Sequence, residues 1–85
     1  LPIFQGTPDA NDPTAFSTTN NDLGVRIQNP SGSTIVPQGG ELPLTMDYGS
    51  QVGKSSISLF PINTTGNAPD TGDFTATATI RAEIQ

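Results

Sequence analysis

The last twelve residues of this 85-residue chain alternate between apolar and polar side chains almost without exception. The apolar positions share one face of an extended chain, and they are Phe74, Ala76, Ala78, Ile80, Ala82 and Ile84. This period of two predicts a half-buried β-strand over residues 74–85. Nothing after this strand can turn back to cover it, so we expect it to pair with a strand supplied from elsewhere.

The remaining composition predicts only a small hydrophobic core. The length of 85 residues allows one small domain at most, and the apolar fraction of 32% is low for a self-sufficient core. There is no Cys to form a disulfide and no His, which is the commonest metal ligand and general base. We therefore expect no metal, no cofactor and no enzymatic activity, and we expect the isolated chain to be marginally stable or unfolded.

The charge and hydropathy patterns exclude several classes of partner. The net charge of −5 disfavours nucleic acids and anionic membranes as ligands, because both repel an acidic protein. No apolar run approaches the roughly 20 residues that span a bilayer, and no signal-peptide pattern is present. We expect no membrane insertion.

Turn-forming residues indicate an all-β fold without helices. Nine Gly and eight Pro are spread along the chain among many Thr, Ser and Asn residues, a composition typical of short strands and frequent turns. The predicted extended segments are 1–7, 15–17, 23–28, 34–36, 41–48, 55–62 and 74–85. The predicted turns and loops are 8–13, 20–22, 29–32, 38–40, 49–54 and 63–72.

The expected core follows from which side chains alternate inward along these strands. In the first strand Ile3 and Phe4 are core candidates, with Phe4 either facing the opposite way or sitting at a bend. Pro43 indicates an edge or a break in its strand. The other inward residues are Leu23, Val25, Ile27, Leu42, Leu44, Met46, Ile57, Leu59 and Pro61. Strands at this spacing predict part of a β-sandwich.

Three motifs suggest chemistry, and each has a simpler interpretation. Asp70-Thr71-Gly72 matches the aspartic-protease tripeptide, but no apolar strand precedes it, so we interpret it as a polar turn. Asp9, Asn11 and Asp12 could ligate calcium, but no bidentate Glu follows at loop spacing, which favours a solvated loop. Asn63-Thr64-Thr65 is a glycosylation sequon, which matters only in a eukaryotic secretory protein.

Three segments together resemble fimbrial subunits (pilins) assembled by the chaperone–usher pathway, such as those of type 1 and P pili. They are residues 3–13 (IFQGTPDANDP), 23–32 (LGVRIQNPSG) and 72–80 (GDFTATATI), in the family's order. The family has a Gly fourteen residues from its C-terminus, and Gly72 holds that position here. It usually has an aromatic penultimate residue, where this chain has Ile84, and its members are nearly twice as long.

The resemblance implies that residues 1–85 are the C-terminal portion of a single pilin domain, which is an immunoglobulin-like sandwich lacking its last strand. Phe74, Ala76, Ala78, Ile80, Ala82 and Ile84 would then border a groove that accepts a donated strand. Gly72 and Ile84 would belong to the motif that the chaperone and usher recognise. The residues that would pack the core against the absent half are Phe16, Leu23, Val25, Ile27, Leu44, Ile57 and Leu59.

The implied function is a structural subunit of an adhesive pilus, assembled by donor-strand complementation and exchange. Its partners would be a periplasmic chaperone, an outer-membrane usher and neighbouring subunits, and it would reach the extracellular pilus through the periplasm of a Gram-negative bacterium. The alternatives are the pilin domain of a tip adhesin and a carbohydrate-binding β-sandwich module. The second would want exposed aromatics, but Tyr48 is the single Tyr and there is no Trp.

Overall fold

A computed structural model describes residues 2–47, 49, 52–70 and 72–82, and within these residues it contains strands and no helix. The all-β class predicted from the sequence is therefore confirmed. The strands are β1 (Pro2–Gly6), β2 (Phe16–Ser17), β3 (Leu23–Gln28), β4 (Thr34–Ile35), β5 (Gln38–Glu41), β6 (Thr45–Asp47), β7 (Val52–Lys54), β8 (Ser58–Asn63) and β9 (Ala78–Ala82).

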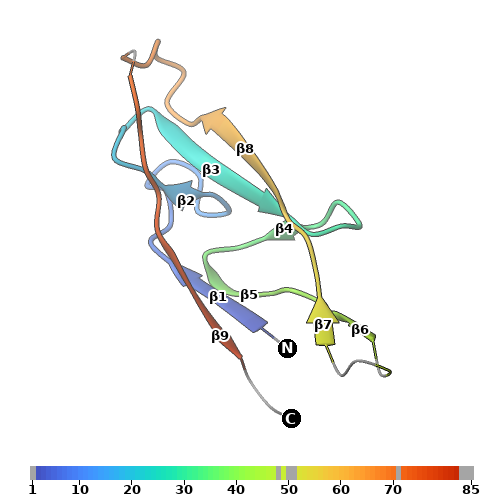
Figure 1. Ribbon diagram of the computed structural model, residues 1–85. Coiled ribbons are helices and arrows are strands. Elements are labelled where there is room, and N and C mark those ends of the chain that lie inside the picture. The colour runs from blue at the N-terminus through green and yellow to red at the C-terminus, as the bar shows by residue number, and fades with distance from the viewer. Residues whose placement is uncertain (1, 48, 50–51, 71, 83–85) are drawn as a thin grey trace.

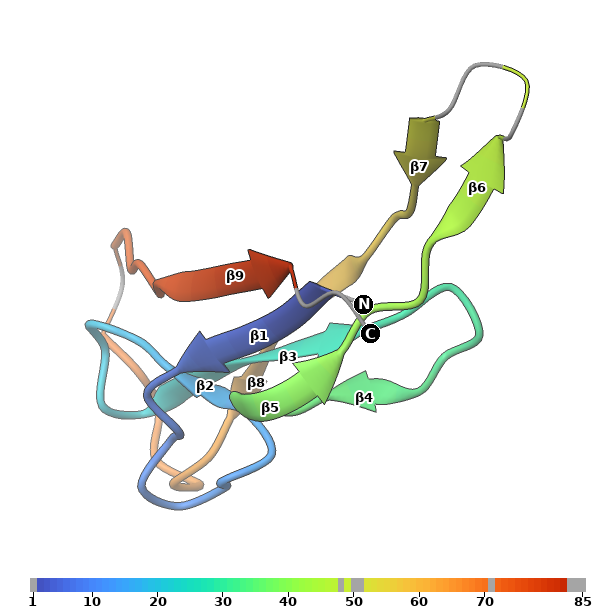
Figure 2. The same ribbon diagram turned by 90° about the horizontal axis from the view of Figure 1, so that it is seen from below.

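Two antiparallel sheets make up the body of the molecule (Figure 1). One has the strand order β5-β1-β9, and in the other β3 pairs with β2, β4 and β8. The longest ladder joins β3 to β8 over six residue pairs, from Leu23↔Asn63 to Gln28↔Ser58. β6 and β7 form a separate hairpin that projects away from both sheets (Figure 2).

The core between the two sheets is small and centred on two phenylalanines. Phe4 of β1 and Phe16 of β2 are almost fully buried, and their rings meet edge to face with centroids 6.4 Å apart. Ile27 of β3 and Ile35 of β4 complete the buried cluster. Gly6 makes room for it, because a Cβ atom at this position would lie 2.6 Å from the Phe16 ring.

The prediction of a turn at residues 38–40 is wrong. Gln38–Glu41 forms β5, which pairs with β1 through Ile3↔Glu41, Phe4↔Gly40 and Gln5↔Gln38. The register shifts between Phe4 and Gln5, so the two glycines form an irregular strand instead of reversing the chain. Glycine is required at 40 because an added Cβ would lie 2.5 Å from the Val36 carbonyl oxygen.

The predicted strand 41–48 and loop 49–54 also need correction. The three residues from Leu42 to Leu44 are not in a strand, which agrees with the predicted break at Pro43. The strand resumes only at β6, and β7 lies where a loop was predicted, because the two short segments pair as a hairpin. The inward position predicted for Leu44 is wrong, since its side chain is exposed. The side chain of Met46 and all of Tyr48 lie outside the described residues.

The predicted terminal strand is shorter in the structure. β9 begins only at Ala78, which pairs with Gly6, the last residue of β1. Upstream of that point Thr75 bonds instead to Thr19, so residues 74–77 are not in a β-strand. Residues 83–85 lie outside the described residues. The predicted strand 55–62 corresponds to β8, which begins later, at Ser58, and ends one residue later, at Asn63.

The molecule is less compact than a typical globular protein of its size. Its accessible surface is 5674 Å², whereas a compact protein of 8.8 kDa exposes about 4,800 Å². Its radius of gyration is 14.5 Å, compared with about 12 Å expected for this length. The projecting hairpin and an incompletely covered interior account for the difference. No helix in the described residues is long and apolar enough to cross a membrane.

Candidate functional site

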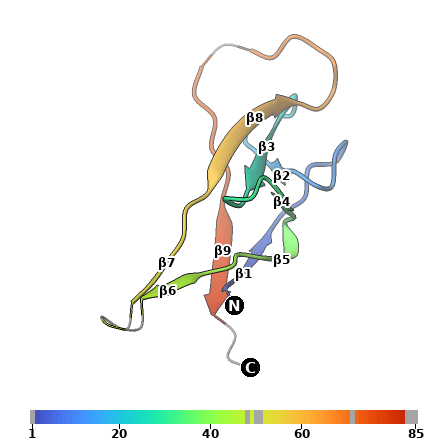
Figure 3. The ribbon, with the colours of Figure 1, turned by 90° about the vertical axis from the view of Figure 1, so that its right-hand side faces the viewer.

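An apolar groove of about 340 Å³ opens between the two sheets on the side where β8 and β9 lie. Figure 3 shows these two strands on one side of the molecule, with β2, β4 and β5 on the other. The residues that line the groove come from both sheets, and they are Phe4, Phe16, Val25, Ile27, Ile57, Leu59, Phe74, Ala76, Thr77, Ala78 and Ile80.

The floor of the groove is buried, but its rims are open. Phe4 and Phe16 at the floor are 2% and 1% exposed. On the rims Ile80 is 55% exposed and Leu59 is 59% exposed, although both are large aliphatic residues. An aligned pair of exposed apolar rims above an aromatic floor is an unusual surface for a monomer, and such surfaces mark places where another segment binds.

β9 forms one rim as an edge strand. It pairs with β1 through five residues, from Pro2↔Ala82 to Gly6↔Ala78, and no described strand pairs with its other edge. Upstream of β9, Thr75 is tied to Thr19 in the loop between β2 and β3, two strands of the second sheet. The Thr19 N–H donates to the Thr75 carbonyl (2.9 Å), and the Thr75 N–H donates to Thr19 Oγ1 (3.0 Å). One end of this rim is therefore fixed across the gap between the sheets.

The structure brings together four of the six apolar residues singled out in the terminal strand. Phe74, Ala76, Ala78 and Ile80 all line the groove. Ala82 belongs to β9, but its side chain is not described, and Ile84 lies outside the described residues. Gly72 is exposed and sits apart from the groove, beside a polar depression lined by Asp22, Asp70 and Asp73.

The facing rim and the floor differ from the sequence prediction. Ile57 and Leu59 were predicted as core residues, but they form the exposed rim opposite β9. Phe4 was a core candidate with no assigned place in the groove, yet it forms part of the floor. Thr77 was assigned to the polar face of a regular strand, but it lines the groove because pairing starts only at Ala78.

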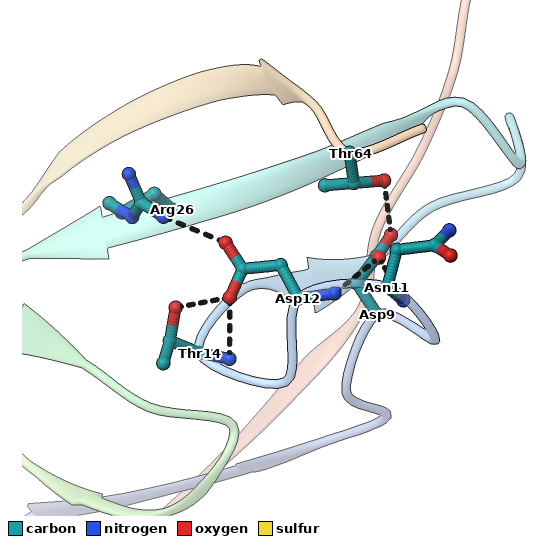
Figure 4. A network of polar contacts seen from close by, with 6 residues as sticks. All are labelled: Asp9, Asn11, Asp12, Thr14, Arg26 and Thr64. Atoms are coloured by element: carbon teal, nitrogen blue, oxygen red, sulfur yellow. Dashed lines mark hydrogen bonds and ion pairs between the residues drawn. The ribbon is translucent and has the colours of Figure 1, made fainter. Parts of the chain in front are cut away.

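In the loop between β1 and β2, hydrogen-bond donors of the protein bind the carboxylates of Asp9 and Asp12 (Figure 4). Asp9 is buried, and its Oδ1 accepts from the N–H groups of Asn11 (2.8 Å) and Asp12 (3.0 Å). Its Oδ2 accepts from the Thr64 hydroxyl at 3.1 Å, which ties the loop to the segment after β8. Groups of the protein therefore bind both carboxylate oxygens of Asp9.

Groups of the protein also bind both carboxylate oxygens of Asp12. Its Oδ1 accepts from the Thr14 hydroxyl (2.6 Å) and the Thr14 N–H (3.1 Å), and its Oδ2 pairs with the Arg26 guanidinium at 2.8 Å. The hydrogen bonds from Thr14, followed by the positive charge of Arg26, lower the pKa of the Asp12 carboxyl below its ordinary value. The described residues contain no group of three or more metal-ligating side chains.

The remaining motifs are parts of loops. Asp70 is exposed, and Thr71 of the protease-like tripeptide lies outside the described residues. The Asn63 side chain organises its own loop, because Oδ1 accepts from the N–H groups of Thr65 and Gly66 and Nδ2 donates to the Asn67 carbonyl.

Comparison with known proteins identifies relatives over the whole chain. The sequence model of the family described as Fimbrial protein matches residues 1–85. Protein LpfD of Salmonella typhimurium is 34% identical over 88 residues, which cover 96% of this chain and 24% of that protein. The probable minor fimbrial subunit LpfD of Escherichia coli O157:H7 is 31% identical over 88 residues, covering 96% of this chain and 25% of that protein.

The chain thus spans about a quarter of the length of these two relatives. No solved structure gives a significant match.

Proposed function

Because the chain belongs to the fimbrial protein family, which is a family of structural and non-enzymatic proteins, we propose that its groove accepts a β-strand donated by another polypeptide during pilus assembly. The chain would form the C-terminal portion of a pilin domain whose other strands lie in the rest of a longer protein. The partners would be a periplasmic chaperone, an outer-membrane usher and neighbouring subunits. The name of the Escherichia coli relative favours a minor subunit on the bacterial surface.

The observation that supports this proposal is that β9 borders an open apolar groove and also has an edge beside which no described strand is paired. Its apolar side chains line an uncovered groove, and its outer edge lacks a paired strand in the described part of the chain. An extended segment with alternating apolar residues meets both needs at once, because its backbone completes the sheet while its side chains fill the groove. Single small ligands would leave the strand edge unpaired.

The expected affinity of such a strand is large. Burial of about 400 Å² of apolar surface would contribute about 10 kcal/mol before the entropy of ordering is subtracted, at about 25 cal/mol per Å². Each backbone group that would otherwise remain unpaired adds about 1 kcal/mol. A joint of this kind is long-lived without any covalent bond between subunits.

A peptide-binding experiment tests the proposal. We expect the full-length protein that carries this sequence to bind a synthetic peptide of alternating valine and threonine flanked by lysines, which suit its acidic charge. Ala78→Asp and Ile80→Asp should each weaken binding about hundredfold, because the new carboxylate would be buried against the incoming apolar side chains. Titration calorimetry measures the dissociation constants.

Thr79→Asp is the matched control. Thr79 lies between the two test positions, is exposed and does not line the groove. This variant introduces the same charge into the same strand, and its affinity should stay close to that of the unmodified protein. Equal losses in all three variants, or binding that none of them changes, would exclude the groove as the binding site.

A further inference from the structure

We infer that the peptide bond between Asp12 and Pro13 is a site of self-cleavage in acid, which the fold keeps intact at neutral pH by binding the Asp12 carboxylate. These two residues are the one Asp-Pro pair in the chain, and they lie in the loop between β1 and β2 (Figure 4). Pro13 is exposed, so water reaches the bond. This covalent change is independent of strand donation to the groove.

The chemistry of the site follows from an aspartyl side chain that precedes a proline. A carboxyl oxygen of Asp12 forms a bond to the Asp12 carbonyl carbon, and the bond from that carbon to the Pro13 nitrogen breaks. The proton of the carboxyl group moves to the nitrogen, which leaves as a secondary amine, and water opens the resulting cyclic anhydride. Because a proline nitrogen has no N–H, it cannot attack the side chain in the competing reaction.

A tight turn over residues 12–15 holds the reacting groups together. The Ala15 N–H donates to the Asp12 carbonyl oxygen (3.0 Å), and the Thr14 N–H donates to Asp12 Oδ1 (3.1 Å). The first bond places a donor at the oxygen on which negative charge develops during the attack. The second bond holds the carboxyl group against the same turn. Ala15 is fully buried, which fixes the end of this turn.

The other contacts of the carboxylate oppose the reaction. Asp12 Oδ2 pairs with the Arg26 guanidinium (2.8 Å), and Oδ1 also accepts from the Thr14 hydroxyl (2.6 Å). Donors that stabilise the ionised carboxylate make it a weaker nucleophile and keep it from taking up the proton that the leaving nitrogen needs. In the described residues, the charged groups that bond to Asp12 are Arg26 of β3 and Asp9 of the same loop.

Acid removes this protection. The hydrogen bonds from Thr14, followed by the charge of Arg26, lower the pKa of the Asp12 carboxyl in the folded protein. An unfolded chain has the ordinary Asp pKa of about 3.9, so it takes up the proton at a higher pH than the folded protein does. Cleavage of the folded protein should therefore begin at a lower pH. It would break the covalent link between β1 and β2, which hydrogen bonds such as that from the Ser17 N–H to the Thr7 carbonyl would still hold together.

A pH series read by mass spectrometry tests the site. The full-length protein that carries this sequence is kept between about pH 2 and pH 7, either folded or unfolded in urea, and peptides that end at Asp12 or begin at Pro13 are measured after digestion. Urea should accelerate cleavage about tenfold near pH 4, which corresponds to the loss of one hydrogen bond to a charged group. Pro13→Ala is the control, because it keeps the carboxylate and its donors but should be cleaved at least about tenfold more slowly.

Arg26→Gln and Thr14→Val test the two protecting donors separately. Each variant should move the pH profile of cleavage in the folded protein toward the profile of the urea-unfolded chain, and circular dichroism verifies that the variant is folded. Arg81→Gln removes the same charge from β9 and should leave the profile unchanged. Equal rates in folded and unfolded protein, or unchanged profiles in both test variants, overturn the protective role. Absence of the two peptides even in urea at about pH 2, or their formation from Pro13→Ala at the unmodified rate, overturns the cleavage site.

Discussion

Asp9 and Asp12 lie close together in the sequence, in a segment that could suggest a calcium site. In the structure, both carboxylates bond to other groups of the protein. Every buried side-chain polar atom in the described residues has a hydrogen-bond partner. The two carboxylates therefore fix the loop through bonds to other groups of the protein. Sequence alone could not separate these outcomes, because Thr64 and Arg26 come from distant segments.

The pKa of Asp12 predicts a loss of stability in acid. Since the folded state lowers this pKa, the ionised carboxylate stabilises the fold at pH values above the ordinary Asp pKa of about 3.9. That contribution is lost as the pH falls through the lower pKa of the folded state. Asp12→Asn should be less stable than the unmodified protein at pH 7, and the difference should shrink below about pH 4.

Urea denaturation at pH 7 and pH 3 measures this difference. Asp70→Asn is the control, because Asp70 is exposed and belongs to no hydrogen bond or ion pair in the described structure. A difference between Asp12→Asn and the unmodified protein that is the same at both pH values would argue against the proposed role of ionisation.

The close packing around Gly40 predicts that any side chain at this position destabilises the protein. Gly40→Ala should destabilise the protein by about 1–3 kcal/mol, because the new Cβ would meet backbone atoms of Val36 that cannot move away. Gly39→Ala is the neighbouring control: its Cβ would meet no atom within 4 Å, so only its positive φ of 85° should cost stability, about 1 kcal/mol. Thermal unfolding distinguishes the two. A smaller effect at Gly40 than at Gly39 would be inconsistent with the close approach.

At the scale of elements, prediction succeeded where local pattern and pairing agree. The alternation over residues 23–28 located β3 with its correct bounds, and Asn29-Pro30-Ser31-Gly32 located the turn to β4. β5 was missed because its two glycines also suit a turn, and only pairing with β1 decides between the two. β7 was missed because short strands depend on a partner strand that local sequence does not show.

The terminal strand shows the same limit within a single element. Its pattern is uniform over residues 74–85, but its environment changes at Ala78. The alternation places Thr75 on the solvent side, and Thr19 lies outside every predicted strand, so no sequence signal marks their mutual bonds. Periodicity predicted that four of the residues that line the groove share one apolar face, whereas the groove itself was implied only by the family resemblance. The floor residues Phe4 and Phe16 come together only through the folding of distant strands.

Thr19→Val tests the link between these two threonines. Valine has nearly the same shape but lacks the hydroxyl that accepts from the Thr75 N–H, so the variant should lose about 1 kcal/mol of stability. Exchange of the Thr75 amide should accelerate while the amides of Arg81 and Thr79 keep their protection. Thr79→Val is the control and should leave Thr75 unchanged. Undiminished protection of Thr75 in Thr19→Val would show that the hydroxyl does not hold this segment.

At the scale of the whole molecule, the open groove accounts for part of the excess exposed surface. The described residues bury few large apolar side chains, while Ile57, Leu59 and Ile80 remain exposed around a common space. Such a sheet pair lacks the covering strands that a sandwich needs for stability. Its relatives are about four times longer, and the length outside the matched region offers room for those strands.

The outer edge of β9, beside which the described residues place no strand, also has a mechanical consequence. A strand donated to this edge would lie lengthwise beside β9, with its hydrogen bonds perpendicular to both strands. Tension applied along the strands from opposite ends loads these bonds together in shear, so that they must break nearly simultaneously. Tension applied across the strands would open them one after another at far lower force. The direction of pull would therefore decide whether the joint between two subunits is strong or weak.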